Sequence, residues 1–319
     1  MIEARFYDSD GSDHPVALAD LAACRPDERQ LLWIDLQAPD ADEVAQVRAA
    51  LRLPEDVLEE DRRRGPAIRV SGRHFRVDAV PVTSSRALGF RGTWLAVIAG
   101  ENCVVTLHQQ PIASLEEIRE IADGESDVGR LSADSFAASV LDWHLSTYFA
   151  ATAEFERQVE SLEVQILDGH SRESLDELRR LRRAASRLRR MLAPHRVVFG
   201  TLSRPDFRPS EGNRAERHYQ ALDTRFERAM DMVEHARELV LGSFELFSGQ
   251  TALQTNRSMG RLTFVTVVLG MLAVITGLLG MNFDATFFAS RDQGFWATAS
   301  SLLVLAVAAV MVGRWRGWV

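Results

Sequence analysis

Two uninterrupted apolar stretches close the chain, whereas the residues before them mix apolar and polar positions. The stretches cover residues 262–281 and 295–313, and neither contains a charged side chain. A helix needs roughly 20 apolar residues to cross a hydrocarbon core of about 30 Å. Each stretch therefore predicts a membrane-spanning helix, and residues 282–294 are expected to form the outer loop between them.

Before this hairpin, residues 1–130 show the mixed pattern of an α/β domain. Four apolar runs have the length and composition of strands: residues 31–36, 74–82, 93–99 and 103–107. Helical patterns over residues 40–51 and 114–121 follow prolines and lie between or after these runs. We expect a cytoplasmic α/β domain here.

From residue 131 onward the pattern is that of long helices. Residues 132–167 lack Pro and Gly, a turn is expected at Asp168-Gly169, and a second helix covers residues 171–191. The second helix carries a basic block, residues 178–190, with seven arginines: Arg179, Arg180, Arg182, Arg183, Arg187, Arg189 and Arg190. The first helix carries acids: Glu154, Glu156, Glu160 and Glu163. We interpret residues 131–210 as an antiparallel pair of oppositely charged helices rather than a nucleic-acid surface, since the net charge is -8.

The next helix is expected to run into the membrane, because no proline follows Pro209. Its cytoplasmic part, residues 211–261, repeats apolar residues every three or four positions: Leu222, Phe226, Met230, Val233, Val240, Phe244 and Phe247. A helix over residues 211–281 is on the order of 105 Å long. We therefore predict a stalk helix that continues as the first membrane helix.

Charged residues near the apolar stretches indicate their orientation. Arg257 and Arg261 precede the first stretch, and a basic tail, residues 314–319, follows the second. Basic residues beside membrane helices stay in the cytoplasm, so both termini are expected there. Acids close to Met1 interrupt any apolar run, which argues against a signal peptide.

The remaining composition excludes several classes of protein. Only Cys24 and Cys103 are present, so no disulfide framework is expected. No phosphate-binding glycine loop, nucleophile and base pair, or metal-ligand cluster emerges from the soluble part. We expect neither an enzyme nor a bound cofactor.

Several segments resemble one known family. Gly280-Met281-Asn282-Phe283, at the outer end of the first apolar helix, resembles the signature of CorA-type divalent cation transporters, which include a zinc-transporting branch. Residues 255–263 are similar to the family's segment at the cytoplasmic end of that helix, and residues 33–36, 58–61 and 104–107 to its soluble domain. The resemblance implies a funnel-shaped homopentamer in the cell inner membrane. It also implies that the first membrane helix lines a central pore.

One stripe of this helix falls where the family lines its pore. Below Asn282 it comprises, at steps of three or four, Gly277, Ala273, Gly270, Thr266, Leu262 and Met259. Bulky residues flank it: Phe264, Val268, Met271, Leu272, Ile275 and Leu278. Small residues at such spacings also permit close helix packing. We favour a pore lining, which requires an oligomer because two helices cannot enclose a water path.

The chemistry of this stripe suits a hydrated cation. No acid or histidine lies between Leu262 and Phe283, so the pore offers amide, hydroxyl and backbone oxygens. Mg²⁺ releases its water reluctantly, whereas Zn²⁺ prefers nitrogen or sulfur ligands. Met259 and Leu262 would form apolar rings that close by dewetting. Asp284 and Asp292 would concentrate cations at the outer mouth.

The sequence also departs from the family. Residues 284–288 replace the family's usual acidic loop after the signature, which leaves ion selectivity open. The stalk acid that the family uses for regulatory Mg²⁺ binding falls at Ala221, with Asp223 as the nearby candidate for a regulatory metal.

The leading hypothesis is a channel for divalent cations, with Mg²⁺ as the first candidate and Co²⁺ or Ni²⁺ as further ones. The membrane potential would drive the ion inward, since it supplies about 2.3 kcal/mol per charge per 100 mV. The first alternative is a zinc uptake transporter coupled to protons. The second, from another class, is a membrane-anchored coiled-coil sensor or scaffold that conducts nothing.

Overall fold

A computed structural model describes residues 2–11, 13–27, 29–58, 65–83, 88–121, 127–169, 171–207, 214–281 and 291–316. The chain divides into two compact units. The first contains Met1–Val164 and Arg172–Ser243, and the second contains Gln165–Ser171 and Phe244–Val319. The long helix α7 (Arg214–Leu279) contributes residues to both units.

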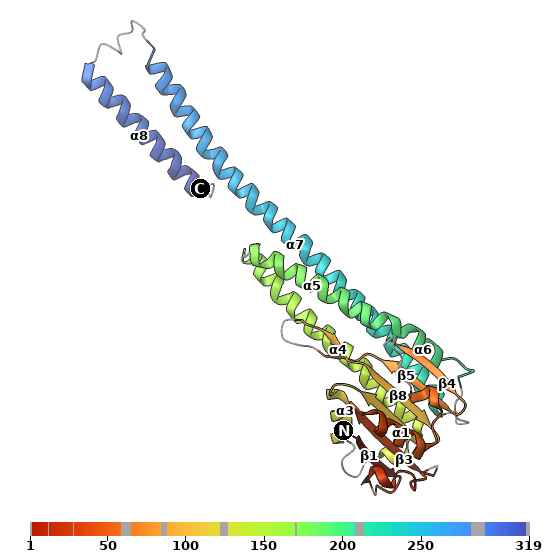
Figure 1. Cartoon of the computed structure of the whole chain (residues 1–319). Coiled ribbons are helices and arrows are strands. Elements are labelled where there is room, and N and C mark those ends of the chain that lie inside the picture. Colours follow the sequence, from red (N-terminus) through yellow and green to blue (C-terminus); the bar gives the residue numbers. More distant parts are fainter. Residues whose placement is uncertain are drawn as a thin grey trace. The chain divides into compact units, whose positions relative to one another are not determined.

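A seven-stranded mixed sheet forms the centre of the first unit (Figure 1). Its strands are β1 (Ile2–Asp8), β2 (His14–Val16), β3 (Gln30–Gln37), β4 (Ala67–Ser71), β5 (His74–Ala79), β8 (Leu95–Gly100) and β9 (Cys103–His108). Their order is β2-β1-β3-β9-β8-β5-β4, and only the β3–β9 pair is parallel among these neighbours. Two short strands, β6 (Val82–Thr83) and β7 (Arg91–Gly92), pair separately.

The four predicted strands correspond to β3, β5, β8 and β9, with one correction. The run at residues 74–82 is not one strand, because β5 ends at Ala79 and β6 begins at Val82. Pro81 lies in the break, and proline has no N–H to donate to a sheet ladder. Strand β1 was not among the predicted runs, although its polar residues alternate with apolar ones as in a strand with one buried face.

Alternation along β3 gives the sheet two different faces. Leu32, Ile34 and Leu36 enter a buried cluster with Val47 of α1 (Ala41–Leu51). An Asp40–Glu43 capping box starts α1, because each side chain accepts from the backbone N–H of the other. The other residues of β3 face α3 (Ala113–Ile121) and α4 (Ala133–Leu167), and the Trp33 ring lies 5.3 Å from the ring of Phe136.

Helices cover that second face of the sheet. Besides α4, they are α6 (Arg196–Leu202) and the part of α7 up to Ser243, whose Tyr219 ring lies 6.3 Å from the Phe75 ring of β5. Helix α5 (Ser171–Leu192) donates from Arg187 to the carbonyl oxygen of Phe90 at 3.2 Å. Further short elements are α2 (Glu55–Leu58), η1 (Leu18–Asp20), η2 (Asp127–Arg130) and η3 (Ala193–His195). Tyr148 of α4 donates to the carbonyl oxygen of Val80 at 2.8 Å, and Arg225 of α7 pairs with Asp142 of α4 at 3.0 Å.

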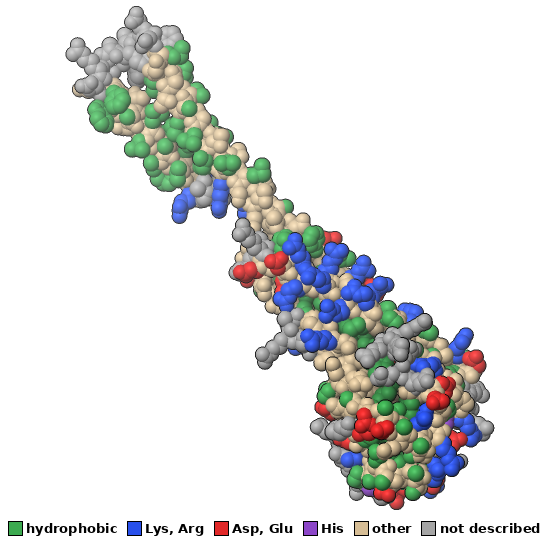
Figure 2. Space-filling view, in the orientation of Figure 1, with side chains coloured by type: hydrophobic (Ala, Val, Ile, Leu, Met, Phe, Trp, Pro, Cys, Tyr) green, Lys and Arg blue, Asp and Glu red, His purple; other side chains and the backbone are tan. Residues whose placement is uncertain are grey.

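The arginines of α5 are paired differently from our prediction. Arg179 and Arg180 form ion pairs with acids of α5 itself, the first with Asp176 at 3.2 Å. Arg189 pairs with Glu234 of α7. Residues three positions apart on one helix are within reach of each other, so Arg179 and Arg180 have acidic partners on α5 itself. Figure 2 shows basic side chains gathered over α5.

The second unit consists of the rest of α7, the turn before α5, and α8 (Arg291–Trp315). Two segments, Ala215–Leu279 and Gln293–Trp315, are each long and apolar enough to cross a membrane. The apolar part of each is unburied within the chain. Together with the first unit, this is the predicted fold class of an α/β domain, a long stalk helix and a C-terminal helical hairpin.

Candidate functional site

The predicted pore-lining stripe lies on one exposed face of α7. Met259 and Leu262 are 62% and 69% exposed, and Thr266 and Ala273 are exposed above them. A Cβ atom placed on Gly270, or on Gly277, meets no other atom within 4 Å. Within the described part of the chain, this face therefore has room for another helix or for water.

The opposite face of α7 packs against α8. Phe264, Val268, Leu272 and Ile275 are half-buried, at helical steps of three or four. At about 100° per residue, the centre of this face lies roughly 160° from that of the stripe. The predicted bulky residues therefore form two groups: some pack against α8, whereas Met271 and Leu278 remain 60% and 61% exposed.

Helix α8 meets α7 through small side chains. Its less exposed positions also follow helical spacing: Gly294, Thr298, Leu302, Ala306, Ala309 and Gly313. Gly313 is buried, and a Cβ atom there would lie 2.6 Å from the Phe264 ring. Small residues let two helices approach closely. Within the hairpin, that packing role belongs to α8 and not to the stripe of α7.

A hydroxyl within the stripe is arranged to present acceptor oxygen. Thr266 Oγ1 donates its proton to the carbonyl oxygen of Leu262 at 2.9 Å. A hydroxyl oxygen that has donated its proton keeps lone pairs to accept from water. The stripe can therefore accept hydrogen bonds from the water shell of a cation without a carboxylate.

The C-terminal end of α7, predicted to be the outer end, is described as far as Met281. The helix ends at Leu279, and Gly280 continues its hydrogen bonding with an N–H donated to the Thr276 carbonyl oxygen at 2.9 Å. Asn282 and Asp284, the other predicted residues of this end, lie outside the described residues. Asp292 belongs to the first turn of α8, so the expected loop over residues 282–294 is shorter than predicted.

At the other end of the stripe, a groove of about 470 Å³ runs along α7. Its lining alternates apolar and small polar residues: Phe244, Phe247, Ser248, Thr251, Ala252, Thr255, Asn256 and Met259. Thr251 and Thr255 donate to carbonyl oxygens one turn earlier, each at 2.9 Å. Phe244 is 52% exposed and Phe247 is half-buried, so the fully buried stalk pattern ends near Val240.

The regulatory candidate Asp223 is half-buried on α7. Nearby, a cavity of about 250 Å³ is lined by residues that include Asp142, His218 and Ala221. Burial raises the pKa of Asp142, and the charge of Arg225 opposes that rise. Among the described residues, no group of three or more His, Cys, Asp or Glu is placed to hold a metal ion. A regulatory role for Asp223 stays a prediction.

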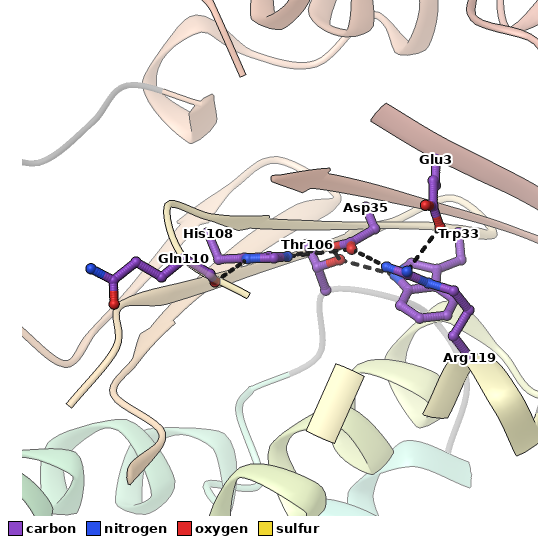
Figure 3. Close-up of polar contacts among 7 residues, drawn as sticks. All are labelled: Glu3, Trp33, Asp35, Thr106, His108, Gln110 and Arg119. Atoms are coloured by element: carbon purple, nitrogen blue, oxygen red, sulfur yellow. Dashed lines mark hydrogen bonds and ion pairs between the residues drawn. The ribbon is translucent and has the colours of Figure 1, made fainter. Parts of the chain in front are cut away.

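A polar cluster in the sheet was missed by the sequence analysis (Figure 3). Asp35 of β3 is 4% exposed. It accepts from Thr106 Oγ1 at 2.5 Å and from Arg119 Nη2 at 2.6 Å. Arg119 also pairs with Glu3 at 3.0 Å, and His108 Nε2 lies 3.1 Å from Asp35. Four elements, β1, β3, β9 and α3, are held together by this cluster.

The same cluster alters the proton affinity of its histidine. Burial lowers the pKa of His108 and is the largest single effect, but the hydrogen bond to Asp35, the charge of Asp35 and the hydrogen bond to Gln110 together raise the pKa overall. Its other ring nitrogen lies 2.7 Å from the carbonyl oxygen of Gln110. Both ring nitrogens therefore face acceptors, an arrangement that favours the charged imidazolium. The sequence signal for this cluster was the presence of charged or polar residues inside the apolar runs at 33–36 and 104–107, because a buried acid requires hydrogen-bond or ion-pair partners.

A second buried polar group lies among the helices of the first unit. The rings of His144 and His195 are 4.7 Å apart. His195 Nε2 accepts from the Val80 N–H, while both ring nitrogens of His144 are buried without a partner among the described residues. Burial lowers the pKa of His195 to about 4 and that of His144 well below its usual value.

Comparison with known proteins gives a consistent result. A family model described as "CorA-like Mg2+ transporter protein" matches residues 28–315. The cobalt/magnesium transport protein CorA of Methanocaldococcus jannaschii is 23% identical over 229 residues, 71% of this chain and 72% of that protein. The divalent cation transporter CmaX of Pseudomonas aeruginosa is 28% identical over 230 residues, 70% of this chain and 65% of CmaX.

Solved structures share the fold along the chain. The complete CorA magnesium transporter of Methanocaldococcus jannaschii matches with a TM-score of 0.75 at 20% identity, covering 100% of this chain and 99% of that one. Full-length CmaX matches with a TM-score of 0.70 at 22% identity, covering 98% and 96%. The ZntB cytoplasmic domain of Vibrio parahaemolyticus matches with a TM-score of 0.60 at 10% identity, covering 79% and 98%.

Proposed function

Because the chain belongs to the CorA-like Mg²⁺ transporter family, we propose that it forms an oligomeric channel for divalent cations, Mg²⁺ foremost. Membership of a transporter family confirms the expectation that the protein is not an enzyme. Two segments able to span a membrane agree with a membrane transporter. The transported ion, the number of subunits and the orientation form part of the proposal.

The stripe on α7 is the observation that carries this proposal. Its residues are exposed, while the opposite face of the same helix packs against α8. An oligomer that turns the stripe inward would leave α8 outside and enclose a water path. By family resemblance, we expect five copies, which lie in the cell inner membrane with both termini in the cytoplasm.

The donor chemistry of the stripe supports a hydrated ion. Hydroxyl, amide and backbone oxygens can hold Mg²⁺ through its water shell, without a bond tight enough to prevent release. The name of one relative points the same way, since it is a cobalt/magnesium transport protein. We therefore propose Co²⁺ as a second permeant ion. Inward movement would follow the membrane potential, which supplies about 4.6 kcal/mol for a divalent ion at 100 mV.

The signature and the neighbouring acids have separate proposed roles. We propose that Asn282 faces the axis at the outer end and holds the incoming hydrated ion. Asp284 and Asp292 would raise the local cation concentration there. Asp223 would bind regulatory metal between subunits, near the position where the family's acid is replaced by Ala221.

Influx of Mg²⁺ into proteoliposomes with a negative interior potential tests the proposal. The intact protein is compared with Asn282→Ala and with Gln293→Ala, a matched amide control at the start of α8. We expect potential-driven Mg²⁺ entry that Asn282→Ala abolishes and Gln293→Ala preserves. Oligomers of every variant are checked by light scattering before reconstitution.

Two other results would move the protein to another function. Entry of Zn²⁺ together with a proton signal, and without Mg²⁺ entry, would make it a proton-coupled zinc transporter. No flux of either ion from intact oligomers would favour a sensor or scaffold. In that case the stripe should also accept bulky residues without consequence.

A further inference from the structure

One close contact fixes the two membrane helices at their cytoplasmic end. The Phe264 ring of α7 lies against Gly313 of α8, which is buried. A Cβ atom on Gly313 would lie 2.6, 2.8 and 3.2 Å from three carbons of that ring. Real Cβ atoms do not approach so closely, so any larger residue at position 313 must displace the ring or the helix that carries it.

This contact lies directly behind the apolar end of the stripe. Leu262 comes two residues before Phe264, which places the two side chains about 200° apart around α7. Met259 is about 140° from Phe264 by the same measure. An α-helix is stiff over one or two turns, so a shift of α7 at Phe264 also shifts Leu262 and Met259.

We propose that Phe264 and Gly313 are positioning residues that set the width of the constriction formed by Met259 and Leu262. This inference rests on the proposed channel function. Gly313 determines how near α7 lies to α8, and Phe264 supplies the bulk that holds it there. The distance of the Leu262 side chains from the pore axis follows from both.

The two residues should affect the constriction in opposite directions. A methyl group added at Gly313 pushes α7 away from α8, and hence toward the axis, which narrows the constriction. A smaller side chain at Phe264 lets α7 move toward α8, which widens it. Substitutions that merely damage the hairpin would instead lower transport at both positions.

Mg²⁺ influx into proteoliposomes, normalised to the number of intact oligomers, measures these effects. For Gly313→Ala we expect influx to fall roughly tenfold, the scale of one overpacked methyl group. For Phe264→Leu we expect influx to rise. The double variant should return toward the unmodified rate, because the added methyl fills the space that the smaller side chain leaves.

A matched control separates position from chemistry. Gly260→Ala adds the same methyl group to α7, at a site where a Cβ atom meets nothing within 4 Å. It should leave influx within about twofold of the unmodified protein. As a second readout, Leu262→Cys in a background with Cys24 and Cys103 replaced by Ser should form disulfides between protomers. Gly313→Ala should speed that crosslinking, and Phe264→Leu should slow it.

The outcomes distinguish this inference from the function on which it rests. If intact oligomers of the unmodified protein pass no divalent cation, the channel proposal fails and this inference with it. If they conduct, but both single variants lower influx or the double variant shows no recovery, only the inference is overturned. Should Gly313→Ala fail to assemble, Phe264→Leu decides: higher influx supports the inference, and unchanged or lower influx overturns it.

Discussion

The two units of this protein place their polar chemistry in opposite surroundings. In the first unit, Asp35 is buried and its oxygens are hydrogen-bonded or ion-paired within the chain. In the second unit, the apolar segments of both helices are unburied within the chain. The small and hydroxyl side chains of the stripe on α7 face away from α8. The Asp35 cluster of the first unit therefore finds its partners within the chain. The second unit leaves its apolar side chains uncovered within the chain, and we propose that lipid and further copies of the chain cover them.

A bulky residue in the stripe tests this comparison with the largest expected effect. Gly270→Leu should reduce Mg²⁺ influx by roughly a hundredfold or more, because the added side chains would narrow the water path along the stripe and make it apolar enough to lose its water. The urea unfolding midpoint of the first unit should not change. Met271→Leu is the control, since Met271 lies beside the stripe and is similarly exposed at 60%. Influx unchanged by Gly270→Leu would remove the stripe from the pathway.

Removal of the central acid of the sheet should have the next largest effect, and on stability alone. Asp35→Ala leaves Arg119 and His108 without their buried partner, which should lower the free energy of unfolding by about 3 kcal/mol. Tryptophan fluorescence in urea measures it. Glu55→Ala, which removes a 78% exposed ion-pair partner, serves as the control. A loss below 1 kcal/mol at Asp35 would mean that the first unit does not depend on its polar cluster.

Acid should weaken the first unit through its buried histidines. The pKa of His195 is lowered from 6.5 to about 4 in the folded state, so the unfolded state binds more protons between these values. Stability contributed by the neutral ring is complete above pH 6.5 and is lost as the pH falls toward 4. His144 acts in the same direction, because its pKa is also lowered by burial.

Replacement of His144 sharpens this prediction. His144→Leu removes one buried group that must gain a proton on unfolding, so the unfolding midpoint should depend less on pH between 6.5 and 4. At neutral pH little stability should be lost, because both ring nitrogens lack a partner among the described residues. An unchanged pH dependence would show that other groups control acid unfolding.

The smallest change in stability is expected from removal of an ion pair of the first unit whose side chains are as exposed as the stripe. Arg73 and Glu101 lie 3.0 Å apart with side chains 65% and 62% exposed. Glu101→Gln should change the free energy of unfolding by less than about 0.5 kcal/mol. If its effect equals that of Asp35→Ala, burial does not distinguish the polar chemistry of the two units.

The sequence predicted elements whose pattern is local. The two apolar stretches, the helices of residues 132–167 and 171–191, and strands β3, β8 and β9 follow from periodicity and length, and the structure confirms them. Family membership, which the placement of Gly280-Met281 suggested, is confirmed as well. The roles assigned to the stripe remain predictions, because they depend on contacts between copies of the chain.

The features that could not be predicted from the sequence depend on contacts between residues far apart in the chain. Arg189 was expected to face acids of α4 but pairs with Glu234, since the register of three packed helices decides the nearest partner. The close contact between Phe264 and Gly313 joins the two helices of the hairpin. Neither is visible in local spacing, because each pairing follows from tertiary packing rather than from helix periodicity.

The cluster around Asp35 constrains how this protein can diverge. A lone change of Asp35 removes the buried carboxylate that binds Arg119 and His108, and a lone change of Arg119 leaves that carboxylate with fewer partners. Descendants that lose the aspartate should therefore replace the arginine and the histidine as well, as a linked set scattered over more than eighty positions of the chain. In the first unit, we expect Asp35, Arg119 and His108 to be conserved or replaced together.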